Sequence, residues 1–374
     1  MGQSPALYAD SSTIQLLEPW IRRHLPRTHE TVLRRFIQLT TGIFEQRSVL
    51  MERIAEGSAF RGTMSSNTTQ VRRILRDTRI HLETVYYPFI KSLLRELPND
   101  VLYFSMDESA HTDGIQIFQV GIITDACTLP LGFIVYDRSD AWADDARLLL
   151  EIIATLIPSQ KTIILLADRI HAGEPFIRTV EKIGWNYIFR LPEDTFIETA
   201  QGWKTVKQLY PRRTSERFWT AIRVWKKASI TAQVSIFRYK RDGFQTVRWY
   251  LISNLPATME RFKEYACRWW QECGFKQMKS GLFEWERSRV TLHERVEILL
   301  MGLYIATWAL WMIGREHEQR PQRKATTEVS QRRRKNIVKQ GIHAWVDASK
   351  HHKTIVLHPL PRLRVLDYER MFTT

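Results

Sequence analysis

Four residues in one segment carry side chains that could bind a phosphate and a metal ion together. Tyr265, Arg268, Glu272 and Lys279 follow one another at intervals of three, four and seven residues, in a segment whose periodicity predicts a helix. At about 100° per residue, all four fall in one narrow stripe along that helix. One carboxylate among two cations and a phenol suits a metal-bridged phosphate chain. A solvated helix face held by ion pairs, such as Arg268 with Glu272, would have the same composition.

Two aspartates earlier in the chain favour the chemical interpretation. Asp107 follows the apolar run 104–106 and Asp168 follows the run 165–167, so each is expected to close a buried strand. If these strands are neighbours, the two carboxylates lie side by side at one rim of a sheet, and a helix returning over the sheet would bring Glu272 to them. Each aspartate taken alone would suit a turn or a cap equally well.

Three converging carboxylates repel one another unless divalent cations lie among them. Two Mg²⁺ ions about 3.5–4 Å apart would activate the attacking oxygen and stabilise the leaving oxygen of an in-line phosphodiester reaction. The sequence therefore predicts a two-metal site at Asp107, Asp168 and Glu272.

The elements that must position these residues change in period along the chain. Residues 13–97 show helical spacing, with helices predicted over 32–44 and 71–97, the second capped by Asn67 with Gln70. The next predicted elements are strands 101–106, 115–123 and 131–136, helix 144–157, strand 162–167, helix 174–183 and strand 185–190. Three antiparallel strands, followed by strands with helical crossovers, predict a ribonuclease-H-like α/β core.

The second half of the chain is expected to interrupt and then complete this core. Alternating runs at 219–225, 229–239 and 246–252 predict a β-rich insertion, and helical spacing resumes at residue 259. The apolar stretch 296–313 is interpreted as a buried core helix rather than a membrane span. The predicted fold class is α/β, with a βββαβαβα ribonuclease-H-like core at 98–190 and 257–314, a β-rich insertion at 191–256, a helical N-terminal DNA-binding domain at 1–97 and a basic C-terminal region at 315–374. That last region would serve dimerisation or DNA contact, and its run 332–335 would otherwise be a solvated charge run.

Charge favours a polyanionic partner. The chain has 55 Lys and Arg against 40 Asp and Glu, a formal net charge of +15. Residues 98–189 are the exception, with 6 basic and 13 acidic side chains and a net charge of −7. That block suits a cation site facing a polyanion, and it would equally suit an ordinary acidic surface. The three cysteines show no disulfide or zinc spacing and the N-terminus has no signal pattern, so a cytoplasmic location is expected.

The combination of motifs resembles a known family. The Tyr-x2-Arg-x3-Glu-x6-Lys spacing, from Tyr265 to Lys279, is similar to the signature of DDE transposases of the insertion sequence 4 family, which includes the Tn-five and Tn-ten type enzymes. The block that begins at Asp168 and runs through residues 184–190, and the β-rich insertion before Glu272, belong to the same resemblance. It extends from about residue 100 to about residue 315.

The resemblance implies roles for individual residues. Asp107, Asp168 and Glu272 would be the catalytic triad and would bind two Mg²⁺ ions, for which Mn²⁺ would substitute. The DNA-binding residues would be Tyr265, Arg268, Lys279, Arg190, Arg169 and Trp249. Among these, Arg190 would be the strand-end arginine and Trp249 would hold a flipped base, although an ordinary strand aromatic is an equal alternative for the tryptophan.

The resemblance also implies a reaction and its partners. The chain would nick each transposon end, form and reopen a hairpin, and join the freed 3′-ends to target DNA. Its partners would be double-stranded DNA with terminal inverted repeats, target DNA and a second copy in a synaptic homodimer, with no membrane, in a prokaryotic, nucleoid-associated setting. The alternatives are a ribonuclease-H-like nuclease without strand transfer and a domesticated, non-catalytic DNA-binding protein. No helix-turn-helix signature shows which N-terminal helix would contact bases.

Overall fold

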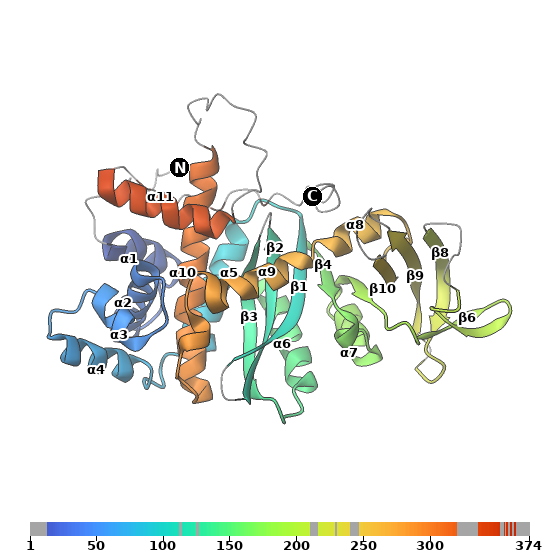
Figure 1. Ribbon diagram of the computed structural model, residues 1–374, viewed down its shortest axis with the longest axis horizontal. Coiled ribbons are helices and arrows are strands. Elements are labelled where there is room, and N and C mark those ends of the chain that lie inside the picture. Colours follow the sequence, from blue (N-terminus) through green and yellow to red (C-terminus); the bar gives the residue numbers. More distant parts are fainter. Residues whose placement is uncertain are drawn as a thin grey trace.

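The computed structural model describes residues 13–351 except 112–113, 125–126, 210–215, 229, 240–246 and 320–335, and beyond them residues 355, 357, 360 and 363. It is a mixed α/β structure in which N-terminal helices and a ten-stranded sheet lie on opposite sides of one long helix, α10 (His293–Gln319) (Figure 1). The predicted run 332–335 lies outside the described residues.

The N-terminal segment is helical, as predicted. Its elements are α1 (Thr13–His24), α2 (Glu30–Gln46), α3 (Met51–Gly57), α4 (Met64–Ile74), a π-helical turn η1 (Leu82–Tyr86) and α5 (Tyr87–Glu96). The single helix predicted over 71–97 is wrong, because residues 75–81 leave the helical path where Asp77 accepts hydrogen bonds from Arg79 and Arg35. The predicted cap is also wrong. Thr63 caps α4 by accepting from the backbone N–H of Ser66, while Asn67 accepts from the N–H of Gly62.

The first five strands and their two crossover helices follow the predicted order. They are β1 (Val101–Ala110), β2 (Ile115–Thr124), β3 (Cys127–Asp137), α6 (Ala143–Leu156), β4 (Thr162–Ala167), α7 (Glu174–Lys182) and β5 (Asn186–Arg190). The first three strands are antiparallel, whereas β4 pairs parallel with β1 and β5 pairs parallel with β4. This arrangement is consistent with a ribonuclease-H-like core.

The β-rich insertion continues the same sheet. Its strands are β6 (Phe196–Thr199), β7 (Gly202–Thr205), β8 (Glu216–Val224), β9 (Ile230–Tyr239) and β10 (Val247–Ser253). The strand order is β3-β2-β1-β4-β5-β10-β9-β8-β6-β7, and Leu251 of β10 lies opposite Arg190 of β5. The insertion is therefore hydrogen-bonded to the strand that follows α7.

The chain then returns over the sheet. The returning elements are α8 (Glu260–Ala266), α9 (Trp269–Lys276), the π-helical turn η4 (Gln277–Gly281) and the 3₁₀ turn η5 (Trp285–Arg287), before α10 and finally α11 (Ile337–His351). In Figure 1, α9 crosses in front of the first strands while α6 lies behind them.

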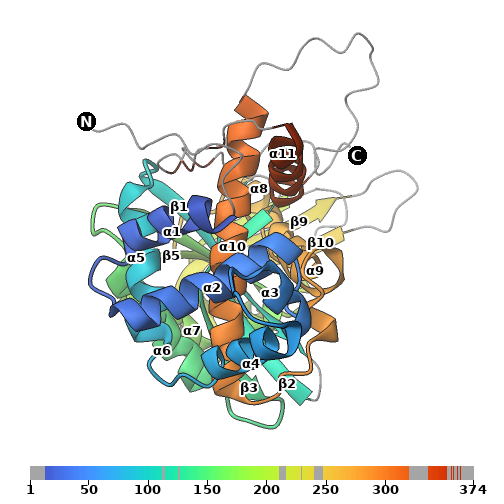
Figure 2. The same cartoon turned by 90° about the vertical axis from the view of Figure 1, so that its left-hand side faces the viewer.

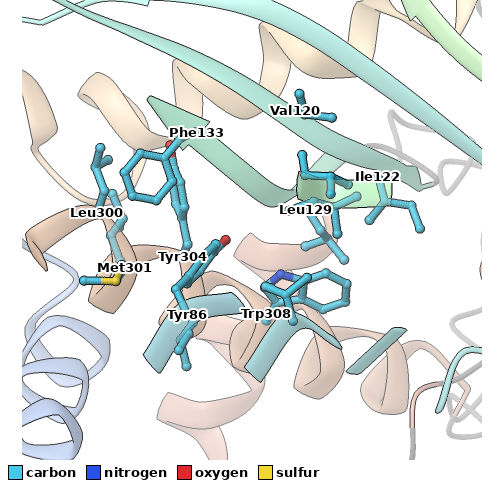
Figure 3. Close-up of a cluster of buried hydrophobic side chains, with 14 of the residues drawn as sticks. Tyr86, Val120, Ile122, Leu129, Phe133, Leu300, Met301, Tyr304 and Trp308 are labelled. Carbon is cyan, nitrogen blue, oxygen red and sulfur yellow. The ribbon is translucent and has the colours of Figure 1, made fainter. Parts of the chain in front are cut away.

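Helix α10 is buried in the hydrophobic core, as the sequence predicted. Trp308 donates from Nε1 to the carbonyl of Pro130 at 2.9 Å, and Tyr304 packs edge-on against Phe133 and tilted against Tyr86 (Figure 3). On its other side α10 contacts α2, so the N-terminal helices surround it when the molecule is viewed from that end (Figure 2). By length and composition this helix could cross a membrane, but 94% of its most apolar window is buried inside the protein. Core helices of this kind pass the same test.

Candidate active site

The parallel pairing of β1 with β4 brings the two aspartates together. The register pairs Met106 with Ala167, so Asp107 and Asp168 are the next residues on neighbouring strands. The sequence suggested that Asp107 closes its strand, and this prediction is wrong. β1 continues to Ala110, and Asp107 pairs with Gln119 of β2. The antiparallel pairing with β2 extends to Ala110, whereas the parallel pairing with β4 ends at Met106.

The segment with the Tyr, Arg, Glu and Lys residues is not one regular helix, so the prediction of a single straight stripe is wrong. α8 ends at Ala266, Cys267 and Arg268 form a turn, and α9 begins at Trp269. Lys279 lies beyond α9 in the π-helical turn η4, whose wider turn no longer follows the 100° rule. Tyr265, Arg268 and Glu272 nevertheless lie near the two aspartates.

Arg268 is the centre of the site. Its Nη1 donates to Asp107 Oδ2 at 2.9 Å and its Nη2 donates to Glu272 Oε1 at 2.5 Å. The guanidinium therefore bridges a strand carboxylate and a helix carboxylate. Both bonds are charge-assisted, and they account for the placement of Glu272 beside β1.

The electrostatics of this cluster show that the carboxylates are close enough to repel. Burial raises the pKa of Asp107, and the charges of Asp168 and Glu272 raise it further, whereas Arg268 and the Glu108 N–H oppose the rise. Burial lowers the pKa of Arg268, but the neighbouring Tyr265, Asp107, Asp168 and Glu272 raise it more, so the guanidinium stays charged. Arg268 thus bonds directly to two of the acidic groups, Asp107 and Glu272, and its charge also acts on Asp168.

Asp168 lies near three groups that can donate hydrogen bonds or carry positive charge. Its Oδ1 accepts from the backbone N–H of Arg169 at 2.7 Å, lies 3.7 Å from Arg190 Nη1, and lies 3.5 Å from the hydroxyl of Tyr265. The position of Arg190 follows from its place at the end of β5, beside β4. The Arg169 side chain, in contrast, is exposed.

The aromatic residue proposed on β10 is also close. The ring of Trp249 packs edge-on against that of Tyr265, with centroids 5.2 Å apart, and it is half-buried. Lys279 is half-buried in η4 and forms no ion pair within the described chain. The structure therefore gathers Tyr265, Arg268, Glu272 and Arg190 at the two aspartates, with Trp249 behind Tyr265. Within the described chain, Lys279 and the side chain of Arg169 form no hydrogen bond or ion pair with the aspartates.

The donor set suits a hard divalent cation. Three carboxylates with side-chain exposures of 20% (Asp107), 28% (Asp168) and 41% (Glu272) supply the oxygen ligands that Mg²⁺ and Mn²⁺ prefer. As they stand, no three His, Cys, Asp or Glu side chains among the described residues are arranged to hold an ion. Arg268 donates to two of the three carboxylates, so a cation would have to displace or share its hydrogen bonds.

One residue beside the site, His171, was not predicted from the sequence. His171 is completely buried three residues after Asp168, enclosed by the rings of Phe118, Trp142 and Phe176, and neither ring nitrogen has a partner in the described chain. Burial lowers its pKa to about 4, so it is neutral near pH 7. A histidine in a turn after a strand gives no periodicity signal. Only the aromatic side chains that meet there in space reveal it.

Comparison with known proteins gives the class to which this fold and site belong. The family model described as the transposase DDE domain matches residues 105–309, more than half of the chain. The chain belongs to this family, whose members generally use divalent metal ions.

The other comparisons add little to this assignment. No curated protein matches the chain. A solved structure, the cryo-EM structure of a piggyBac transposase synaptic complex with hairpin DNA, is similar with a TM-score of 0.42 and 10% sequence identity, over 91% of this chain and 78% of that one.

Proposed function

We propose that this member of the transposase DDE family cuts and joins DNA at a site formed by Asp107, Asp168 and Glu272. The observation that carries the proposal is the convergence of Asp107 in β1, Asp168 directly after β4 and Glu272 in α9, with Arg268 joining the first and the third. Carboxylates that repel one another are kept together in proteins when a cation is to be bound between them.

The residues of the chain divide the chemistry. Asp107, Asp168 and Glu272 would hold two Mg²⁺ or Mn²⁺ ions, which supply Lewis-acid activation of the attacking and leaving oxygens. Arg268 and Arg190 would bind the phosphate beside the scissile bond, as charge-assisted donors that face the same carboxylates. Tyr265 is held against Asp168 and would fix the position of the DNA backbone by donating from its hydroxyl.

The finer assignment follows the resemblance to the insertion sequence 4 family. It is supported by the spacing from Tyr265 to Lys279 and by the ring of Trp249 beside Tyr265, where an extruded base would stack during hairpin formation. We assign cut-and-paste transposition of an insertion sequence, acting as a homodimer on paired terminal inverted repeats and a target DNA. The proposed domains are 1–97, 98–190 with 257–314, 191–256 and 315–374, and the proposed location is the nucleoid of a prokaryotic cytoplasm.

A strand-transfer assay separates this proposal from its alternatives. Paired duplexes carrying the DNA that flanks the coding sequence are incubated with the full chain, Mg²⁺ and a supercoiled target, and Asp107→Asn serves as the inactive control. Joined products from the wild type, absent with Asp107→Asn, support transposition. Nicking without joining would indicate a nuclease, and binding without cleavage would indicate a non-catalytic protein.

A further inference from the structure

Helix α4 is bordered by two hollows, each lined by four arginines and by no carboxylate. The inner hollow lies between α4 and the start of α10, and its arginines are Arg72, Arg76, Arg289 and Arg295. The outer hollow lies between α4 and α2, and its arginines are Arg34, Arg35, Arg61 and Arg73. In Figures 1 and 2, α4 lies at the outer edge of the N-terminal helices, beside the start of α10.

These arginines largely lack counter-charges. Of the eight, only Arg35 forms a salt bridge within the described chain, with Asp77. Elsewhere on the surface arginines are commonly paired, as Arg178 is with Glu174 and Arg223 with Glu198. Seven arginines without a salt bridge in the described chain, gathered at two hollows, suit an anion with several charges, and the guanidinium group suits phosphate because it donates two parallel hydrogen bonds.

The helix between the hollows presents hydrogen-bonding side chains. Asn67, Thr68, Val71 and Ile74 form its buried face. On the opposite side Ser65 is exposed and Thr69 is half-exposed, whereas the exposed Ser66 and the half-exposed Gln70 lie on the flank that lines the outer hollow. This outer face is polar, with arginines at its C-terminal end. α3 and α4 are joined by residues 58–63, so the pair forms a helix, a connection and a second helix with a polar outer face.

Taken together, the hollows and the helix fit one kind of partner. The major groove of B-form DNA is about 12 Å wide, admits a single helix and is bordered on both sides by a phosphate backbone. Eleven residues of α4 extend over about 16 Å, enough to contact several base pairs. An acidic peptide or a single strand would need one basic groove, whereas a duplex explains two grooves on either side of a polar helix.

We propose that α4 enters the major groove of the transposon-end duplex, with the inner and outer hollows each binding one of the backbones that border the groove. Ser65 and Thr69 face the base edges, and Ser66 and Gln70 lie between them and the backbone in the outer hollow. This inference rests on the proposed function, to which it adds the element that contacts bases.

The inner hollow also connects this duplex to the catalytic site. Arg289 and Arg295 belong to the segment between η5 and the first turn of α10, and η5 contacts η4, which carries Lys279. The hollow is therefore built from the N-terminal helices on one side and from the chain that follows Glu272 on the other. A backbone bound there is fixed to both parts of the molecule at once.

Binding measurements without catalysis test the proposal. Fluorescence anisotropy is measured in EDTA with the full chain and a duplex of the DNA that flanks the coding sequence, a scrambled duplex and a single strand. The double variant Arg72→Gln with Arg289→Gln removes two positive charges from the inner hollow. Arg61→Gln with Arg73→Gln removes two from the outer hollow. Arg178→Gln with Lys182→Gln on α7 removes the same charge from exposed residues elsewhere.

The expected results differ between the variants. Each hollow variant should bind both duplexes at least tenfold more weakly, and the slope of log affinity against log salt should fall by about two relative to the α7 control. Ser65→Ala with Thr69→Ala should instead lower the ratio of end to scrambled affinity and leave the salt slope unchanged. Salt slopes equal to the control, or the same losses on single-stranded DNA, would overturn the proposal.

The outcome remains distinct from that of the proposed function, because binding in EDTA does not depend on the carboxylates. A wild-type chain that binds the duplex but neither cuts nor joins in Mg²⁺ would contradict the proposed catalysis and leave the role of α4 standing. A wild-type chain that cuts and joins DNA, with hollow variants that bind the duplex normally, would support the proposed catalysis and contradict the role of α4.

Discussion

The guanidinium of Arg268 lies 2.9 Å from the carboxylate of Asp107 and forms a salt bridge that joins the turn between α8 and α9 to the middle of β1. The two residues are 161 positions apart in the chain. Arg268 thus supplies, inside the protein, the positive charge that the carboxylate cluster needs when no other cation is bound.

Replacing Arg268 with Ala should therefore make stability depend on metal. Without metal the free energy of unfolding should fall by about 1–3 kcal/mol, because the hydrogen bond to the mostly buried Asp107 is lost. Mn²⁺ should raise the melting temperature of the variant more than that of the wild type, since a bound ion replaces the missing charge. Thermal unfolding with EDTA or with MnCl₂ measures both effects.

Arg261→Ala is the matched control for this experiment. Arg261 pairs with the buried Glu264 at 3.0 Å on α8, away from the aspartates. Its loss should lower the melting temperature equally with and without Mn²⁺. An Arg268→Ala chain that gains no more from Mn²⁺ than the wild type would show that the guanidinium does not compete with the ion.

Glu272→Gln should abolish cleavage and leave DNA binding intact. The change keeps the size of the side chain but removes the negative charge that a divalent cation needs as a ligand. Cleavage of end duplexes should fall by at least about a hundredfold, while anisotropy in EDTA should stay within twofold of the wild type. Glu264→Gln, in the same returning segment, should retain cleavage. If Glu272→Gln cleaved the duplexes as fast as the wild type, Glu272 would not belong to the proposed triad.

Stability should decline in mild acid because of His24. This side chain is buried against Trp20 and Phe89, and burial lowers its pKa from 6.5 to about 4. Between these values the unfolded chain binds a proton that the folded chain does not, so the contribution is fully present above pH 6.5 and is lost as the pH falls toward 4. The loss amounts to roughly 3 kcal/mol.

Urea denaturation of variants between pH 7 and pH 4 measures this loss. His24→Gln should reduce the slope of stability against pH without removing it, because the pKa of His171 is lowered over the same range. Ser92→Ala removes the hydrogen bond at His24 Nδ1 but keeps the imidazole, so it should lower stability at pH 7 and keep the acid slope. An unchanged slope in His24→Gln would assign the acid sensitivity to other groups.

Gly341→Ala should weaken the packing of α11 on α10. A Cβ at this position would overlap the carbonyl oxygen of Leu310, which is backbone and cannot rotate away. The free energy of unfolding should fall by about 1–3 kcal/mol in urea denaturation. Gly302→Ala is the comparison, because its Cβ would meet side-chain atoms, Ile43 Cδ1 at 3.0 Å and Leu39 at 3.4 Å, and its effect should stay below about 1 kcal/mol. Equal effects from both substitutions would contradict the close backbone approach at Gly341.

Much of the core could be predicted because its signals are local. The buried strand β4 (Thr162–Ala167) was predicted to the residue, since a short, fully apolar run between polar turns has few alternatives. The proximity of Asp107 and Asp168 then followed from topology alone. The neutral His171 and the pairing of β10 with β5 could not be predicted, because both depend on contacts between residues far apart in the sequence.

The geometry of the returning segment was also beyond local rules. The residues around Cys267 include no Gly or Pro that would mark the end of α8, and the π-helical turn at Lys279 has no sequence signature. The interval of seven residues between Glu272 and Lys279 therefore suggested a common face that the backbone does not preserve. Arg268 donates instead to Glu272 on α9 and to Asp107 on β1, a strand 161 positions away in the chain.

The N-terminal helices pack on α10, so their folding cannot be completed before α10 has been synthesised. Helices α1 to α5 end at Glu96, but the helix that covers their apolar faces begins at His293, about 200 residues later. At ribosomal rates of about 5–20 residues per second, the nascent N-terminal helices wait roughly 10–40 s for it. A chain truncated before α10 would leave the helices and the sheet without the surface they share. The nascent chain therefore exposes these apolar faces to chaperones and proteases until α10 has been synthesised.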